Sequence, residues 1–123
     1  MPNSQDTALK WLRLLQDQAL PLRSVFFEQV AAGAVTSLCD CGCNGFDFLV
    51  PDGAIVAPLQ SGSGLFCELA FESNLSEEID ILLFADVRGN LCRVDVTYGA
   101  GNHDAMPDNI TATRLIGIWP SQS

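Results

Sequence analysis

The chain has 123 residues, 48% of them hydrophobic, and a formal net charge of −9 at pH 7. A chain of this length suits one domain and buries enough apolar surface to fold without a disulfide or a metal, so we expect a single domain over residues 1–123. The densest apolar run, residues 81–85, is far shorter than the ~18 residues of a membrane helix. Residues 1–6 lack the basic and apolar parts of a secretory signal, and these features together predict a cytoplasmic protein.

The acidic residues are concentrated in the middle of the chain. Between Ser24 and Val87 there are ten acidic residues and no Lys, Arg or His. Because phosphate groups are bound by Lys and Arg, this segment argues against a nucleic-acid or anionic-membrane partner. Two interpretations remain, namely a charged surface that keeps the protein soluble and a docking face for a basic protein.

The first third of the chain has the periodicity of helices. Apolar residues recur at helical spacing over 7–19, where Ser4 or Asp6 is placed to cap the helix. The pattern resumes after Pro21, a residue that suits the first position of a second helix, and it stops at Gly33. We therefore expect two short helices joined by a tight turn as an αα-hairpin.

After the second helix the apolar period changes to that of β-strands. The expected strands span residues 34–38, 46–50, 65–71, 79–85, 92–98 and 114–119, whereas 55–59 is interrupted by Pro58 and suits an edge or a loop. Helices followed by strands favour an α+β fold. We expect the two N-terminal helices to be packed on the apolar face of a mainly antiparallel β-sheet, in two layers.

The segments 79–85 and 92–98 are expected to form a hairpin. A two-residue turn at Gly89-Asn90 would place Asp86 opposite Arg93. A turn at Arg88-Gly89 would shift the register by two residues and keep the same side chains on each face, so it stays open as the alternative.

One face of this predicted sheet mixes acidic and apolar side chains, because Leu82 and Phe84 share it with carboxylates. Such a mixture is typical of a binding surface, unless a helix covers it. The candidate partner-binding residues are Glu68, Glu72, Asp80, Asp86 and Asp95. The sequence thus predicts a non-catalytic, acidic protein-binding module that docks a basic partner, similar in size and charge to small inhibitor or immunity proteins.

Three of the five cysteines, Cys39, Cys41 and Cys43, are separated by single residues. An odd number of cysteines favours reduced thiols over a disulfide scaffold. In an extended strand the first and last of the three would be ~13 Å apart, so a shared zinc ion needs a bend at Gly42. A fourth zinc ligand would have to come from a distant residue, for which Cys67, Cys92 and His103 are the candidates.

Two further interpretations of the cysteine cluster compete with zinc. A reactive thiol needs nearby positive charge, whereas Asp40 and Asp47 are the charged neighbours in the sequence. A structural role as small buried residues is the preferred interpretation. A small zinc- or thiol-dependent protein is the alternative function. We assign no catalytic residue, since His103 beside Asp104 in a polar loop is more typical of an exposed side chain than of a general base.

The Cys-Gly-Cys segment at 41–43 follows the helix pair and precedes a strand, a glycine turn at Gly89 and a strand that carries Asp95. This order resembles a group of small uncharacterised bacterial domains with a Cys-Gly-Cys segment before a β-hairpin. The resemblance covers Cys39–Tyr98 and implies the same sheet layout, with no activity attached. Those domains often have proline after the second of the two cysteines, where this chain has Asn44.

Overall fold

The computed structural model describes residues 3–40, 43–99 and 106–121, and within them it contains two helices and six strands. The helices are α1 (Gln5–Gln16) and α2 (Arg23–Ala32). The strands are β1 (Ala34–Leu38), β2 (Phe46–Leu49), β3 (Gly64–Ser73), β4 (Ile79–Ala85), β5 (Leu91–Tyr98) and β6 (Ala112–Pro120). All six strands were expected from the sequence, and residues 55–59 lie in the loop between β2 and β3.

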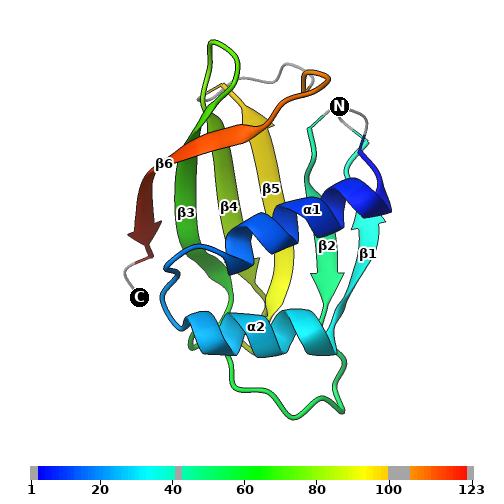
Figure 1. Cartoon of the computed structure of the whole chain (residues 1–123). Coiled ribbons are helices and arrows are strands. Elements are labelled where there is room, and N and C mark those ends of the chain that lie inside the picture. The colour runs from blue at the N-terminus through cyan, green and yellow to red at the C-terminus, as the bar shows by residue number, and fades with distance from the viewer. Residues whose placement is uncertain (1–2, 41–42, 100–105, 122–123) are drawn as a thin grey trace.

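The strands form one sheet in the order β1-β2-β5-β4-β3-β6, and every neighbouring pair is antiparallel. The predicted α+β class is therefore confirmed, as is the antiparallel character of the sheet. The order is not sequential, because β2 pairs with β5 and β6 pairs with β3 (Figure 1). These two pairings bring together residues that lie 39 to 53 positions apart in the sequence.

The helix boundaries follow from local signals. Ser4 is the N-cap of α1, and its hydroxyl oxygen accepts a hydrogen bond of 3.1 Å from the Thr7 N–H. Pro21 does not open α2 as expected, because the helix begins at Arg23 after Leu22, whose φ is 52°. The predicted stop at Gly33 is confirmed, since this glycine is the C-cap of α2.

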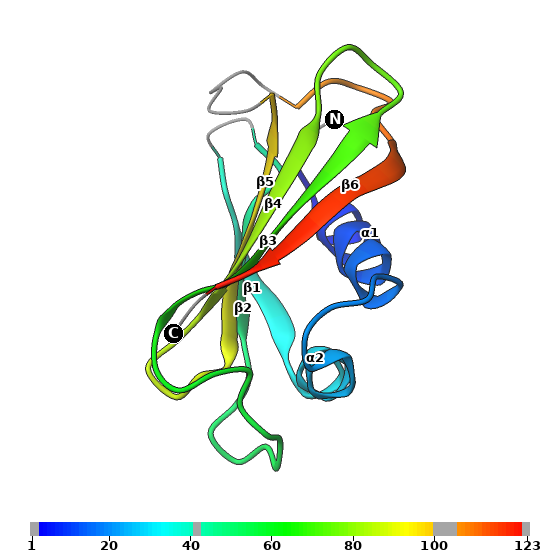
Figure 2. The ribbon, with the colours of Figure 1, turned by 90° about the vertical axis from the view of Figure 1, so that its left-hand side faces the viewer.

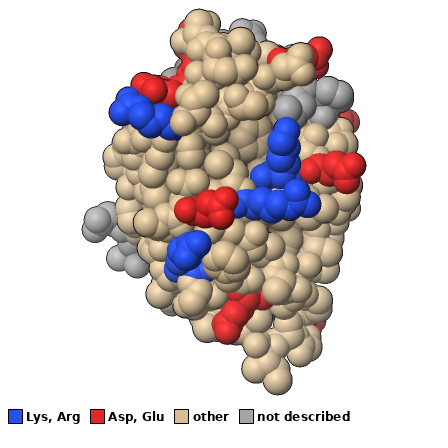
Figure 3. Space-filling model, viewed as in Figure 1, with Lys and Arg blue, Asp and Glu red and all other residues tan. Residues whose placement is uncertain are grey.

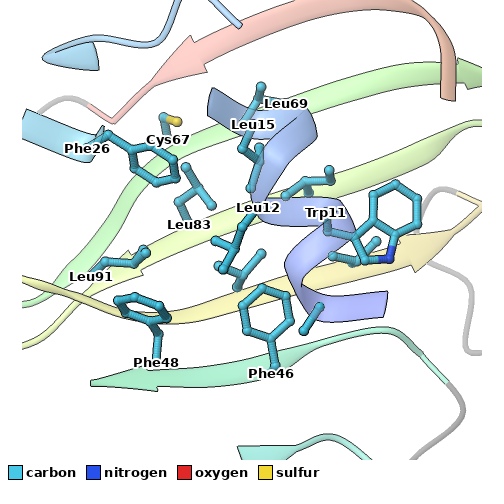
Figure 4. Packing of buried hydrophobic residues seen from close by; sticks show 14 of the residues in the cluster. Trp11, Leu12, Leu15, Phe26, Phe46, Phe48, Cys67, Leu69, Leu83 and Leu91 are labelled. Carbon is cyan, nitrogen blue, oxygen red and sulfur yellow. The ribbon is translucent and has the colours of Figure 1, made fainter. Parts of the chain in front are cut away.

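Figure 2 shows both helices on the same side of the sheet. Trp11, Leu12 and Leu15 of α1 and Phe26 of α2 are buried in one cluster with sheet residues (Figure 4). The sheet residues of this cluster include Phe46, Phe48, Cys67, Leu69, Phe71, Ile79, Ile81, Leu83, Val94 and Val96. The apolar side chains of alternating strand positions therefore share a core with the helices.

The β4–β5 hairpin corrects the preferred register from the sequence. Phe84 lies opposite Arg93, so Asp86 does not. This is the register expected for the alternative turn at Arg88-Gly89. The turn itself is longer by one residue, because the Gly89 N–H donates to the Asp86 carbonyl and Gly89 has a φ of 81°. Such a three-residue loop with a glycine in the left-handed region forms a bulge at its end, which neither sequence alternative included.

A second bulge, in β3, interrupts the alternation of faces that a period of two predicts for the strand over 65–71. Leu65 lies opposite Phe84 and Cys67 lies opposite Leu83, so Phe66 is an extra residue between two paired positions. Cys67 is fully buried on the helix side, as alternation predicts, whereas Leu65 lies on the other face with Phe84. Because Phe66 is inserted, Leu65 and Cys67 lie on opposite faces of the sheet, although they are two residues apart in the strand.

A buried glutamine links α2 to the sheet through side-chain hydrogen bonds. Gln29 is fully buried, and its Oε1 accepts a hydrogen bond of 2.7 Å from the Leu91 N–H. Its Nε2 donates to the Ala57 carbonyl at 2.8 Å and to the Asn90 Oδ1 at 3.0 Å. One side chain thus satisfies polar groups of the β2–β3 loop and of the β4–β5 turn, where water is excluded.

Replacing this glutamine tests how much these hydrogen bonds contribute to stability. We expect Gln29→Leu to lower the free energy of unfolding by about 2–4 kcal/mol, because buried backbone groups lose their partner. Urea denaturation measures the loss. Glu28→Leu, an exposed change in the same helix, serves as the control and should have an effect within about 0.5 kcal/mol. Equal effects of the two substitutions would show that the buried hydrogen bonds are not needed.

Candidate functional site

The second face of the sheet carries the acidic residues of interest. In β4, Ile79, Ile81, Leu83 and Ala85 are buried, whereas the alternating Asp80, Leu82 and Phe84 are half-buried. We call the face of these three residues the open face, because Figure 2 shows both helices on the opposite side. By strand register it also contains Asp47, Leu65, Glu68, Glu72, Arg93, Asp95, Thr97, Arg114 and Trp119.

Four of the five predicted partner-binding residues lie on the open face. Glu68 and Asp95 flank Leu82 on β3 and β5, in a single row across the sheet. Asp80 lies one row further along β4, and Glu72 lies beyond it on β3. The sequence pattern therefore placed these carboxylates on a common face, because strict alternation determines the side on which each residue lies.

Three carboxylates of the open face are paired with arginines. Arg93 donates from Nη1 to Asp47 Oδ1 at 2.8 Å and from Nε to Asp95 Oδ1 at 2.7 Å. Arg114 donates two hydrogen bonds, of 2.7 and 3.0 Å, to the carboxylate of Glu72, and this pairing lowers the pKa of Glu72. The pKa of Asp47 is also lowered, first by the hydroxyl of Ser37 and then by Arg93.

Asp86 has a different role from the one expected. Its Oδ1 accepts hydrogen bonds from the backbone N–H groups of Arg88, at 2.9 Å, and Asn90, at 3.1 Å. The carboxylate therefore stabilises the β4–β5 turn, in the manner of an Asx-turn. Arg88 also approaches it at 3.5 Å and forms a second ion pair with Asp52. The charge of Asp86 is thus largely engaged within the chain.

Glu68 and Asp80 form no ion pair with any residue in the described part of the chain. Burial raises the pKa of Asp80 to about 7, and the hydrogen bond and charge of Glu78 and the charge of Glu68 add to the effect. The raised pKa thus reflects burial first, and the neighbouring carboxylates of Glu78 and Glu68 second, with no opposite charge among its causes. The open face therefore has an uncompensated acidic centre at these residues.

This raised pKa makes a prediction about stability. Asp80 is uncharged in the folded protein below a pH of about 7 and loses that proton above it, at a cost in folding free energy. We expect Asp80→Asn to raise the free energy of unfolding by about 1–2 kcal/mol at pH 8, after allowance for partial exposure. The gain should disappear below pH ~4, where aspartate is protonated in both states. Urea denaturation at the two pH values checks this, and an equal gain at both would contradict it.

Cys39 and Cys43 lie between β1 and β2. Both side chains are half-buried, and the backbone N–H of Gly45 donates to the Cys43 Sγ at 3.3 Å. Cys41 and His103 lie outside the described residues. Within the described ranges no group of three or more His, Cys, Asp or Glu side chains is placed to hold a metal ion. The zinc site at Cys39, Cys41 and Cys43 therefore stays a prediction.

The other two cysteines have weakly acidic thiols. Burial raises the pKa of Cys67 to about 12. Burial and the charges of Asp86 and Asp47 raise the pKa of Cys92. Because the thiolate is the nucleophile, neither side chain is activated for chemistry at neutral pH. Both cysteines are also candidates, from the sequence, for the fourth zinc ligand, and that role stays a prediction.

Asn44 is a structural residue that the sequence did not single out. It is fully buried, its side-chain oxygen accepts a hydrogen bond of 3.1 Å from the indole Nε1 of Trp11, and its N–H donates to the Val96 carbonyl. A proline here, as in the resembled bacterial domains, would have neither donor nor acceptor for these contacts. Asn44 thereby ties the cysteine hairpin to α1 and β5.

A double-mutant cycle tests this contact. We expect Asn44→Ala to cost about 1–3 kcal/mol of unfolding free energy, because the indole N–H of Trp11 loses its buried acceptor, whereas the backbone hydrogen bond to the Val96 carbonyl is kept. The Trp11→Phe substitution removes the same hydrogen bond from the other side. Denaturation of both single variants and the double variant should give a coupling of about 0.5–1.5 kcal/mol. Strictly additive losses would show that the two side chains do not interact.

Within the described residues, neither helix has the length and apolar character required to span a membrane. Comparisons of the chain with protein-family models, with curated proteins and with solved structures return no match. The resemblance of Cys39–Tyr98 to small bacterial domains therefore stays a prediction. The function has to be argued from the residues of this chain.

Proposed function

We propose that the protein is a non-catalytic, acidic protein-binding module of the cytoplasm, which docks a basic partner protein on the open face. The observation that carries the proposal is the pair Glu68 and Asp80, two carboxylates that no described base neutralises. The proposal takes the molecule as one domain of two layers, with the helix pair covering one face of the sheet. The other face is then available to a partner.

The distribution of charge supports a sheet-side partner. Residues 1–33, which contain both helices, have three basic and three acidic residues, so their charges cancel. Residues 34–123 have three basic and twelve acidic residues and account for the whole net charge of −9. Figure 3 accordingly shows basic and acidic side chains interspersed on the helix side. Electrostatic attraction of a basic protein would be directed to the sheet.

The apolar residues of the open face supply contact area. Leu82 and Phe84 are half-buried at its centre, and Trp119 is 49% exposed at its margin. Protein interfaces combine such apolar and aromatic centres with a polar rim. The open face has this composition, whereas a surface that serves only solubility needs no aromatic residue. The same excess of carboxylates disfavours nucleic acids and anionic membranes as partners.

A salt-dependent pull-down with charge-matched variants tests the proposal. Immobilised wild-type protein should retain a basic protein from a lysate of its native cell at 50 mM salt and release it at about 500 mM, because salt screens exposed charges. The double variant Glu68→Gln/Asp80→Asn should lose most of the bound protein. The control Asp17→Asn/Glu28→Gln makes the same two types of substitution on the helix side and should bind as wild type does; both variants are compared at pH 8, where Asp80 is ionised.

Two outcomes would contradict the proposal. Equal losses in the two double variants would show that net charge alone, and not the open face, causes retention. Retention of only neutral or acidic proteins, unaffected by salt, would show that electrostatic attraction is not the basis of binding.

A further inference from the structure

Trp119 lies beside the acidic centre of the open face. It is the strand partner of Glu68, across the β3–β6 pair, and directly opposite residues on one face have their Cβ atoms about 4.5–5.5 Å apart. A Cβ atom placed on Gly117 would lie 2.8 Å from Cζ2 of the Trp119 ring. The indole therefore lies back over Gly117, in the space that the missing side chain leaves.

The row of the sheet over which the indole lies also contains Asp80, two strands away from Gly117. Gly117 is the strand partner of Ala70, and Ala70 is in turn the partner of Asp80 on β4. Ala70 is 4% exposed although it lies on the open face, which fits a cover of neighbouring side chains. Glu68 therefore lies opposite Trp119 in its own row, and Asp80 lies in the next row beyond the small side chain of Ala70.

The arginines of the open face are engaged elsewhere. Arg114 forms its two hydrogen bonds with Glu72, and Arg93 bridges Asp47 and Asp95. Neither is paired with Glu68 or Asp80, the carboxylates beside the indole. Within the described residues, no cation is paired with these two carboxylates. A half-exposed indole beside such carboxylates is complementary to an incoming cation.

We propose that Trp119, Glu68 and Asp80 form a seat for an arginine side chain of the partner protein, with its guanidinium stacked on the indole and hydrogen-bonded to the carboxylates. The inference rests on the proposed function and specifies the partner residue. Arginine fits better than lysine, since its planar guanidinium stacks on aromatic rings and presents a fork of donors to carboxylates. Its aliphatic stem can lie against Leu82, which is half-buried beside Glu68.

Titration with defined peptides, followed by the two indole N–H signals in ¹H–¹⁵N spectra, tests the seat. The chain has two tryptophans, and Trp11 is an internal control because its indole is buried and bound to Asn44. A peptide of alternating arginine and leucine should shift the Trp119 signal and leave that of Trp11 unchanged. The same peptide with citrulline, an uncharged isostere, should bind at least tenfold more weakly.

Variants separate the indole from the charges. We expect Trp119→Leu to weaken binding of the arginine peptide about three- to tenfold. Gly117→Ala keeps every charge and displaces the ring, so it should weaken binding in the same direction. Ile55→Ala, which removes a fully exposed apolar side chain of the β2–β3 loop, is the control and should bind as wild type. Unfolding free energies of all variants identify any loss of folding.

The outcomes also distinguish the inference from the proposed function. If Trp119→Leu and Gly117→Ala bind the arginine peptide as wild type does, the seat is wrong, whatever the pull-down shows. Equal affinity for the citrulline peptide would overturn it as well. If Glu68→Gln/Asp80→Asn loses the natural partner while Trp119→Leu retains it fully, the acidic face stands and the arginine seat does not.

Discussion

The fold is held together by one apolar core, in which one side of the six-stranded antiparallel sheet is buried against side chains of the two helices. β4 shows the constraint most clearly, since every second residue from Ile79 to Ala85 is buried and the residues between them are half-buried. Trp11, Leu12 and Leu15 of α1 join the same cluster. The chain has two described helices, and Figure 2 shows both on one side, so the polar side of the sheet carries whatever function the surface has.

That polar side is not organised for its own stability. Arg93 and Arg114 form ion pairs with Asp47, Asp95 and Glu72, but the pKa of Asp80 is raised to about 7 by burial and by neighbouring carboxylates. An acidic group held in this way disfavours the free folded state at neutral pH. Functional surfaces commonly retain such unfavourable groups because a ligand relieves them on binding. Electrostatic frustration beside Trp119 and Leu82 is therefore the physical basis of the proposed partner site.

Much of this arrangement could be predicted from the sequence, because it depends on the spacing of apolar residues and on whether a residue holds an odd or an even position in its strand. The strands, the Ser4 cap, the Gly33 stop and the common face of Glu68, Asp80 and Asp95 could be predicted from spacing alone. The register of the β4–β5 hairpin could not, since the three-residue turn and the extra residue Cys92 in β5 are not revealed by spacing. The bulge at Phe66 in β3, which sets the face of Leu65, gave no signal either.

The contacts between distant segments were also beyond the sequence. Asp47 meets Arg93 only because β2 pairs with β5, and Trp119 reaches Glu68 only because β6 crosses to β3. Gln29 and Asn44 gave no signal, because their importance arises from the buried groups that tertiary packing brings to them. The local sequence pattern thus determines which face of the sheet is acidic. The order of the strands determines which carboxylates on that face form no ion pair within the described residues.

The most direct measurement of the central claim compares paramagnetic relaxation of side-chain signals by a cationic and a neutral nitroxide in solution. The account predicts that the cationic probe enhances relaxation at Leu82 and Trp119 well above the neutral probe, with no such excess at Leu9 and Leu22 on the helices. Leu83, on the buried side of the same strand, should be protected from both. Equal enhancement on the two sides of the molecule, or protection of Leu82 as complete as that of Leu83, would contradict an open acidic face.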